Sequence, residues 1–340
     1  MIGELQRAVE NYRAQYARQE GAVVDYMDAV HLRIALEIRR EIEAIAESLE
    51  GVDPSGPGEA RALLSRKGRL EERLEQIELR AMAYVPVLAG AMEDASGAAI
   101  SMGARHGLGM MRSVVGVQFN RVPFSALRDQ AAALVPGAPL DRLLRGWAGG
   151  AATAVSDQLM AGIAKGDNPR KVALDMAKAL ASGTRGTPVE PLLHRATTIA
   201  RTETIRSYRS ASIATYKANP EVVDGWIWNS AGNQTTCPVC WAMHGTKFDA
   251  GDHFESHPNC RCSPSPSVPG YDTDLPPGEE LFAALPEREQ LAVLGPGRYA
   301  MYARGDLRLS DLVGRSHHPV WGGGRFERSI RDVERRRRGA

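Results

Sequence analysis

The four cysteines of this 340-residue chain all lie in one short stretch, CPVCWAMHGTKFDAGDHFESHPNCRC, which runs from Cys237 to Cys262. Cys237 and Cys240 have the two-residue spacing at which neighbouring thiolates bind one metal ion. Cys260 and Cys262 form a second pair, because residues two apart in an extended chain point to the same side. Two such pairs across a loop of this length fit the tetrahedral coordination of zinc. We therefore predict a zinc site in this stretch.

The second half of the ligand set has three candidates. Cys237 and Cys240 are the firm ligands, and the others must come from His257, Cys260 and Cys262. We predict coordination by the four thiolates, with His257 as the reserve ligand. The polar N-terminus lacks the pattern of a secretory signal, which predicts a reducing cytoplasm and disfavours disulfides. Free or transiently oxidised thiols are the alternative to a bound metal.

A zinc site in this stretch could be structural or catalytic. A catalytic zinc keeps an open coordination position and has a base nearby. Asp252, His253 and Glu255 are close enough in the sequence to supply one. The stretch nevertheless holds enough strong ligands to close the coordination shell, and thiolate-rich sites are mostly structural. We expect a structural zinc and no catalytic residue.

The elements that carry this stretch begin with long helices. Apolar residues recur every three or four positions on two segments that are separated by GVDPSGPGE at 51–59, a helix breaker with two prolines. This pattern predicts an antiparallel pair of helices. The apolar positions are Ile34, Ile38, Ile42, Ile45 and Leu49 in the first segment, and Leu63, Leu70, Leu74 and Ile77 in the second.

Further helices and one strand lead into the cysteines. Residues 89–117 are rich in glycine and alanine, which predicts closely packed helix. Asn168 can cap a helix that begins at Pro169, and helical spacing returns before Asn219-Pro220. The alternation of Trp226 and Trp228 around an isoleucine predicts a strand with both indoles on one face. The stretch SPSPSVPGYDTDLPPGEE after the last cysteine predicts a proline-rich linker, followed by short helices.

These elements predict a mainly α fold: long N-terminal helices, then a helical domain that carries a small zinc-stabilised β module (α+β). The expected divisions are a helical N-terminal region at 1–135, a domain at 140–265 with the zinc module at 225–264, and a C-terminal part at 266–340. That last part would contain the linker, short helices and a basic tail. Arg201, Glu203 and Arg206 share a predicted helix, and their spacing allows an ion pair on the helix surface.

Composition and charge narrow the function classes. The chain is 43% hydrophobic and 24% charged, as in soluble globular proteins. Its longest apolar run is interrupted by Pro86 and is too short to span a membrane. The net charge is +1, which gives no overall signature of nucleic-acid binding. Residues 325–340 hold seven arginines and three acidic residues. We interpret them mainly as a solvated tail, with contact to phosphate or an acidic surface as the alternative.

Three segments taken together resemble a known family. They are ARTETIRSYRSASIATYKAN at 200–219, TTCPVCWAMHGTKF at 235–248 and HPNCRC at 257–262, in this order around the tryptophan strand. The chain resembles the phage head morphogenesis proteins named after the Mu F protein, over about residues 156–264. The matching residues are Ala200, Arg201, Thr202, Glu203, Cys237, Cys240, Gly245, His257, Pro258, Cys260, Arg261 and Cys262.

The resemblance implies a minor head or minor capsid protein of a tailed bacteriophage. Such a protein associates with the portal protein or the major capsid protein, acts in head assembly or genome delivery, and is oligomeric within the virion. It would be assembled in the host cytoplasm and lie in the head interior or at the portal vertex, where the C-terminal arginines could contact packaged DNA. Some relatives carry an enzyme domain, but this chain has no G-x-S-x-G motif and no spare cysteine, so we expect no enzymatic activity.

Two other functions stay open at this point. One is a zinc-dependent hydrolase or an ADP-ribosyltransferase-like effector carried in the head, for which Glu255 or Glu203 would be the functional residue. The other is a nucleic-acid-binding zinc module that uses Arg261 and the arginine-rich C-terminus. The role of the first 135 residues is not indicated by the resemblance.

Overall fold

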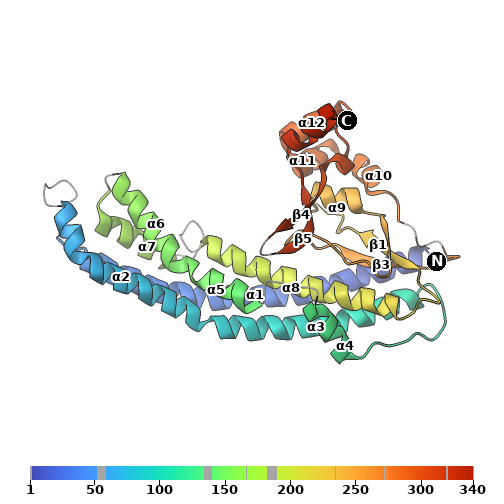
Figure 1. The fold of residues 1–340 in the computed structure, drawn as a ribbon, viewed down its shortest axis with the longest axis horizontal. Helices are drawn as coiled ribbons and strands as arrows, with labels where there is room; N and C mark the ends of the chain where they lie inside the picture. Colours follow the sequence, from blue (N-terminus) through green and yellow to red (C-terminus); the bar gives the residue numbers. More distant parts are fainter. Residues whose placement is uncertain are drawn as a thin grey trace. The chain divides into compact units, whose positions relative to one another are not determined.

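The computed structural model describes residues 2–51, 59–133, 140–165, 167–181, 190–233, 235–271, 273, 275–318 and 321–339. Helices dominate these residues, and the strands are short and few, so the predicted mainly α fold is confirmed. The helices before the cysteines are α1 (Ile2–Ser48), α2 (Glu59–Ala83), α3 (Val85–Arg112), α4 (Phe124–Ala133), α5 (Leu140–Ala148), α6 (Gly150–Ala164), α7 (Pro169–Ala181) and α8 (Glu190–Lys217) (Figure 1).

The elements from the tryptophan strand onward are shorter. They are β1 (Gly225–Asn229), α9 (Pro238–Met243), β2 (Lys247–Asp249), β3 (Ser263–Ser267), α10 (Gly278–Ala283), α11 (Glu287–Ala303), the 3₁₀ helix η1 (Leu309–Leu312), β4 (Val313–His318), β5 (Gly322–Glu327) and α12 (Ile330–Gly339). Among the described residues, no helix has an apolar stretch long enough to cross a membrane.

The chain packs into two compact units. Unit 1 comprises Met1–Glu20, Asp94–Ala138 and Arg201–Ala340, and unit 2 comprises Gly21–Glu93 and Pro139–Ala200. The helices α1, α3 and α8 each contribute residues to both units. All residues of the predicted metal site lie in unit 1.

Unit 2 contains the predicted antiparallel helix pair. Glu41 of α1 accepts hydrogen bonds from Arg80 (2.7 Å) and Arg73 (3.3 Å) of α2, and Tyr84 donates to Glu37 (2.8 Å). Residues later in α2, and Tyr84 just after it, therefore contact residues earlier in α1. This is the order of contacts in an antiparallel helix pair. The stripe from Ile34 to Leu49 is buried as its spacing predicts. The breaker between the helices falls mostly on 52–58, outside the described residues.

The remaining boundaries of unit 2 agree with helix-capping chemistry. The Oδ1 atom of Asn168 accepts from the backbone N–H groups of Arg170 (2.9 Å) and Lys171 (3.3 Å), so it caps α7 as predicted. Pro169 is the first residue of that helix.

Unit 1 has a three-stranded antiparallel sheet with the order β2-β1-β3. Trp226 of β1 faces Phe248 of β2 and Pro266 of β3, and Trp228 faces Pro264. Both indoles stack on the ring of Phe254, at centroid distances of 4.9 and 4.0 Å, so they share one face as predicted. This face joins the hydrophobic core of unit 1, to which Cys240, Cys260 and Cys262 belong.

Close helix packing in unit 1 explains part of the glycine content of 89–117. A Cβ atom at Gly103 of α3 would lie 2.2 Å from the carbonyl oxygen of Tyr208 in α8. Only a residue without a side chain allows the two helices to approach so closely. The hydroxyl of Ser212 also donates to the Gly103 carbonyl (3.1 Å), which fixes the contact.

The segment after the cysteines differs from the prediction. Its proline-rich start was expected to be a linker, yet Ser263–Ser267 forms β3 at the edge of the sheet. Prolines are tolerated in an edge strand because the outer side needs no N–H donor. A two-stranded sheet, β4 with β5, was also missed. The arginine-rich end was interpreted mainly as a solvated tail, and most of it is the helix α12.

Candidate metal centre

The first two candidate ligands are held by a short helix. Cys237 is the N-cap of α9, and its Sγ atom accepts from the backbone N–H of Cys240 at 3.4 Å. Pro238 fills the first helical position, where no N–H donor is needed. The helix begins here because the N-cap residue and the proline at the first helical position both favour a helix start. It therefore directs the Cys237 and Cys240 side chains to the same side.

The other candidates lie on the loop between β2 and β3. His257 directs Nδ1 to the carbonyl oxygen of Pro258 at 2.7 Å, which leaves Nε2 for a metal. Asn259 has a φ of 62°, a left-handed conformation that asparagine adopts more readily than most residues. Its backbone N–H donates to the hydroxyl of Thr202 in α8 at 3.0 Å, so the loop is tied to that helix.

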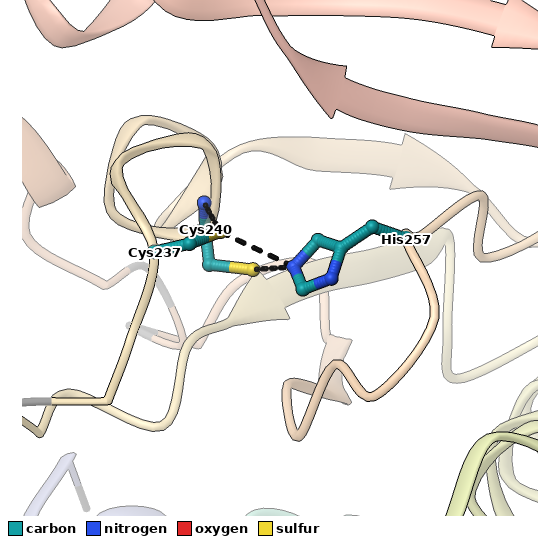
Figure 2. A group of neighbouring side chains, drawn as sticks. All are labelled: Cys237, Cys240 and His257. Carbon is teal, nitrogen blue, oxygen red and sulfur yellow. Dashed lines mark hydrogen bonds between the residues drawn. The ribbon is translucent and has the colours of Figure 1, made fainter. Parts of the chain in front are cut away.

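Five donor atoms gather in this place. The Nε2 atom of His257 is 3.2 Å from Sγ of Cys237 and 3.3 Å from Sγ of Cys240 (Figure 2). The Sγ atoms of Cys240 and Cys260 are 3.6 Å apart, and Cys262 completes a second group with these two. Ligands of a tetrahedral zinc with bonds of about 2.0–2.3 Å are about 3.3–3.8 Å apart. The three distances given above are close to this range.

Protons are shared unevenly among these five side chains. A hydrogen bond with Cys240, opposed by burial and assisted by His257, lowers the pKa of Cys237 to about 5. Burial opposes ionisation of Cys260, but hydrogen bonds with Cys240 and Cys262 outweigh it and hold the pKa of Cys260 well below its usual range. Burial also favours neutral His257, yet its bonds with Cys237 and Cys260 raise its pKa to about 11. The imidazolium thus supplies the positive charge that two thiolates require, a role that a metal cation takes over when it displaces the protons.

The remaining two thiols stay protonated. The hydrogen bond with Cys237 raises the pKa of Cys240, and burial raises that of Cys262. Because Cys240 lies in both donor groups, its thiol is the common member of the cluster.

A buried arginine donates hydrogen bonds to the loop that carries the donors. Arg209 of α8 is 2% exposed and directs each of its three nitrogens to a different acceptor. Nε donates to the carbonyl oxygen of Cys262 (2.8 Å), one terminal nitrogen to that of Cys260 (2.9 Å), and the other to the hydroxyl of Ser256 (2.7 Å). Its guanidinium also lies 4.3 Å from the centre of the Phe254 ring. The sequence analysis missed Arg209, because nothing in the local pattern distinguishes it from other helix arginines.

A second group of charges ties the loop to α1. Glu20, which is 8% exposed, pairs with Arg201 (2.9 Å) and with Arg261 (3.1 Å). The predicted ion pair between Glu203 and Arg206 is present at 3.2 Å, but both side chains are largely buried and not on an open helix surface. Burial raises the pKa of Glu203 against the opposing effect of Arg206. Arg206 also donates to the carbonyl oxygen of Trp321 at 2.8 Å.

The candidate catalytic groups lie elsewhere. Glu255 pairs with Arg315 at 3.5 Å, Asp252 accepts from the backbone of Asp249, and His253 is exposed. Within the described part of the chain, the groups of side chains that could hold a metal contain cysteine and histidine but no carboxylate.

The family comparison matches the segment that builds this cluster. Residues 153–265 match the family model described as Phage Mu protein F like protein. This segment is similar to the phage Mu F-like family. The predicted resemblance is thereby confirmed, and the family indicates a phage head protein of the virion that contacts other head proteins. No curated protein and no solved structure matches the chain.

The Mu F-like segment begins in α6 and ends within β3. It therefore contains all five donor residues, as well as Arg209 and Thr202, which hold the donor loop. Glu20 and the elements after β3 lie outside it.

Proposed function

We propose that this protein is a minor head protein of a tailed bacteriophage, associated with the portal or capsid, and that it acts in head assembly or genome delivery. A structural zinc ion would stabilise its Mu F-like segment. The observation that carries the proposal is that this segment contains the complete cysteine and histidine cluster. The partners would be the portal protein, the major capsid protein or both.

The proposed zinc ligands are Cys237, Cys240 and Cys260 with one further donor. The contacts of His257 with Cys237 and Cys240 support this histidine as the fourth ligand. The four-thiolate set with Cys262, which the spacing favours, is the alternative. Either set closes the tetrahedral shell with protein atoms.

A closed shell supports a structural role. Cys240, Cys260 and Cys262 are buried, and a carboxylate base is missing from the donor groups of the described residues. Bound zinc would connect α9, which precedes β2, to the loop between β2 and β3. It would therefore hold together two segments on either side of β2 in the sequence. Zinc sites in small peptides contribute about 10–16 kcal/mol near neutral pH. A sheet of three short strands gains most from such a connection, because it buries little apolar surface by itself.

Metal content and cobalt spectra test the site. We expect one zinc per chain in the purified protein, and a cobalt-substituted form with the visible bands of tetrahedral coordination. His257→Ala should weaken zinc binding and keep the thiolate-to-cobalt charge-transfer band at the same intensity per bound metal. Cys262→Ser should leave both unchanged. His253→Ala is the matched control, because His253 is exposed and outside the cluster.

Two results would contradict this ligand set. If Cys262→Ser lowers the charge-transfer intensity and His257→Ala does not change zinc affinity, the four-thiolate set is correct. If the purified protein holds no zinc and does not bind added zinc, the proposed site is wrong.

The assembly role is tested on particles. We expect the protein in purified virions and proheads of its phage, and co-purification with the portal or major capsid protein after co-expression. Deleting its gene should lower the yield of infectious particles. Absence from both virions and proheads would contradict the proposal. The enzymatic alternative is tested by supplying variants to the phage that lacks the gene. If no reaction is involved, the Glu255→Gln and Glu203→Gln proteins should each restore the particle yield as well as the wild-type protein does.

A further inference from the structure

Two cavities on the surface of unit 1 flank the last helix, α12, and arginines line both. One cavity has a volume of about 410 Å³ and is lined by Arg308, Arg328, Arg336 and Arg337, among others. The other has a volume of about 390 Å³ and is lined by Arg315, Arg328, Arg335 and Arg336, among others. Arg328 and Arg336 border both cavities. We call these six arginines the arginine surface.

The arginine surface belongs to a folded helix and not to a loose tail. Val333 is 2% exposed and packs α12 into a hydrophobic cluster with Leu309 and Leu312. The hydroxyl of Ser329 accepts from the backbone N–H of Asp332 at 3.2 Å and caps the helix. With Val333 directed inward, the neighbouring Arg335, Arg336 and Arg337 are exposed. The helix thus presents several guanidinium groups in a fixed arrangement.

Local carboxylates neutralise only part of this charge. Asp311 pairs with Arg337 (3.0 Å), Glu255 with Arg315 (3.5 Å), and Asp332 with Arg335 at a longer 3.8 Å, which leaves Arg308, Arg328 and Arg336 without a carboxylate ion pair among those of the described residues. Glu327 also lines one cavity, but its partner is Arg298 at 2.8 Å, outside the arginine surface. The surface therefore keeps an excess of positive charge.

Like charges lie close together within the arginine surface. Arg328 donates to the carbonyl oxygen of Asp311 at 3.1 Å and stands between the two cavities. Burial and the neighbouring Arg336 guanidinium lower the pKa of Arg328 against the opposing effects of Asp311 and Asp332. An anion in either cavity would relieve this repulsion, and phosphate matches the planar donor fork of arginine best.

We propose that the arginine surface binds the phosphate backbone of duplex DNA without sequence preference. Phe326 is the one aromatic residue and no asparagine or glutamine is among the residues that line these two cavities, so they offer little for stacking on bases or for reading base edges. Ten residues of helix extend about 15 Å, enough to contact several successive phosphates. The choice of DNA over an acidic protein rests on the proposed function, because a phage head is filled with DNA.

Fluorescence anisotropy with a labelled mixed-sequence duplex of about two helical turns tests the proposal. The full-length protein should bind it, with an affinity that falls steeply as salt rises. The variant Arg335→Gln/Arg336→Gln/Arg337→Gln should bind at least about tenfold more weakly and reduce the slope of log K against log salt by about 3. Arg336→Gln alone keeps both ion pairs of α12 and should reduce the slope by about 1.

A matched control removes the same charge elsewhere. Arg112→Gln/Arg121→Gln/Arg128→Gln changes three exposed arginines outside the arginine surface and should bind DNA like the wild type. Equal binding by both triple variants would overturn the proposal. So would displacement of the DNA by poly-glutamate at equal charge concentration, which would assign the surface to an acidic protein partner.

The result is separable from the test of the proposed function. If the full-length protein does not bind DNA but has normal zinc content and is incorporated into heads, only the DNA surface is refuted. If the triple variant loses DNA binding and is still incorporated normally, only the importance of this surface for assembly is refuted. DNA binding by a protein that is absent from virions supports phosphate recognition and refutes the assembly role.

Discussion

The residue with the largest predicted influence on the metal loop is Arg209, although it is not itself a ligand. It satisfies two backbone carbonyls and one hydroxyl around the donor loop while it is buried. Arg209→Met would leave these acceptors without donors, at about 1–3 kcal/mol each. We expect the free energy of unfolding to fall by about 3 kcal/mol and zinc affinity to fall about 10- to 100-fold. Thermal unfolding with competitive zinc titration measures both.

The variant Arg209→Lys distinguishes geometry from charge. Lysine keeps the positive charge, but one ammonium group cannot reach three separated acceptors as the guanidinium does. It should therefore restore only a small part of the loss. A lysine variant as stable as the wild type would contradict the proposed role of the fork.

The buried His31 predicts that the stability of the protein decreases in acid. Burial lowers the pKa of His31 to about 4, and neither ring nitrogen has a hydrogen-bond partner among the described residues. The unfolded chain binds this proton near pH 6.5 and the folded chain only near 4, so stability is full above 6.5 and falls as pH drops between these values. His31→Phe should make the stability curve flatter in this window, by up to about 1.4 kcal/mol per pH unit. Urea unfolding of both proteins in excess zinc, at a series of pH values, measures the difference.

Spacing alone located the candidate ligands but not the residues that hold them. The knuckle of Cys237 and Cys240 and the pair of Cys260 and Cys262 are local patterns, so they were predictable. Arg209 reaches the loop from 47 to 53 positions away in the chain. Such a contact depends on how α8 packs against the sheet, which no local pattern encodes.

At the scale of elements, the turn from α9 to β2 depends on Gly245. Its φ is 82°, and an added Cβ would lie 3.0 Å from the carbonyl oxygens of Leu275 and Pro276. Gly245→Ala would add about 1–2 kcal/mol of backbone strain to this steric conflict. We expect a loss of more than about 2 kcal/mol in the free energy of unfolding, measured by chemical denaturation.

Two other glycines distinguish the backbone strain from the steric conflict. Gly232 has a φ of 65° with open space around it, so Gly232→Ala should cost only the backbone strain. Gly251 has open space and no positive φ, and Gly251→Ala should be nearly neutral. Equal losses at Gly245 and Gly232 would show that the contact with Leu275 and Pro276 is unimportant.

Periodicity predicted the long elements well and the short ones poorly. The helix stripe from Ile34 to Leu49 and the alternating tryptophans of β1 produce strong patterns, because one face of each is buried. The strand β3 is SPSPS, whose composition is typical of a linker. It is a strand because its ladder with β1 and the core beneath it override local propensity.

For the whole molecule, Trp241 connects the metal cluster to the C-terminal elements. It follows Cys240 in α9 and packs edge-on against Phe282 of α10 at 5.8 Å. The same hydrophobic cluster contains Leu312 and Val333. Trp241→Ala should cost about 3–5 kcal/mol and release protection of α10–α12 in hydrogen exchange. Full protection of these helices in the variant would contradict the connection.

The division into units was not predictable from sequence patterns. Unit 1 combines the first 20 residues with segments from the middle and the end of the chain. Long helices that contribute to both units carry no local signal of this boundary, since each reads as one continuous periodic segment. Removal of zinc tests whether the two units respond separately.

Removing zinc should affect unit 1 far more than unit 2. The expected zinc contribution of about 10–16 kcal/mol equals or exceeds the stability of a typical domain, about 5–15 kcal/mol. Chelation should therefore expose the amides of β1, α9 and β3, together with the first 20 residues through the contact of Glu20 with Arg261. Amides of 34–49 and of α2 should stay protected. Hydrogen exchange with mass spectrometry before and after chelation, and again after zinc is restored, measures this, and equal deprotection of both units would contradict a structural zinc confined to unit 1.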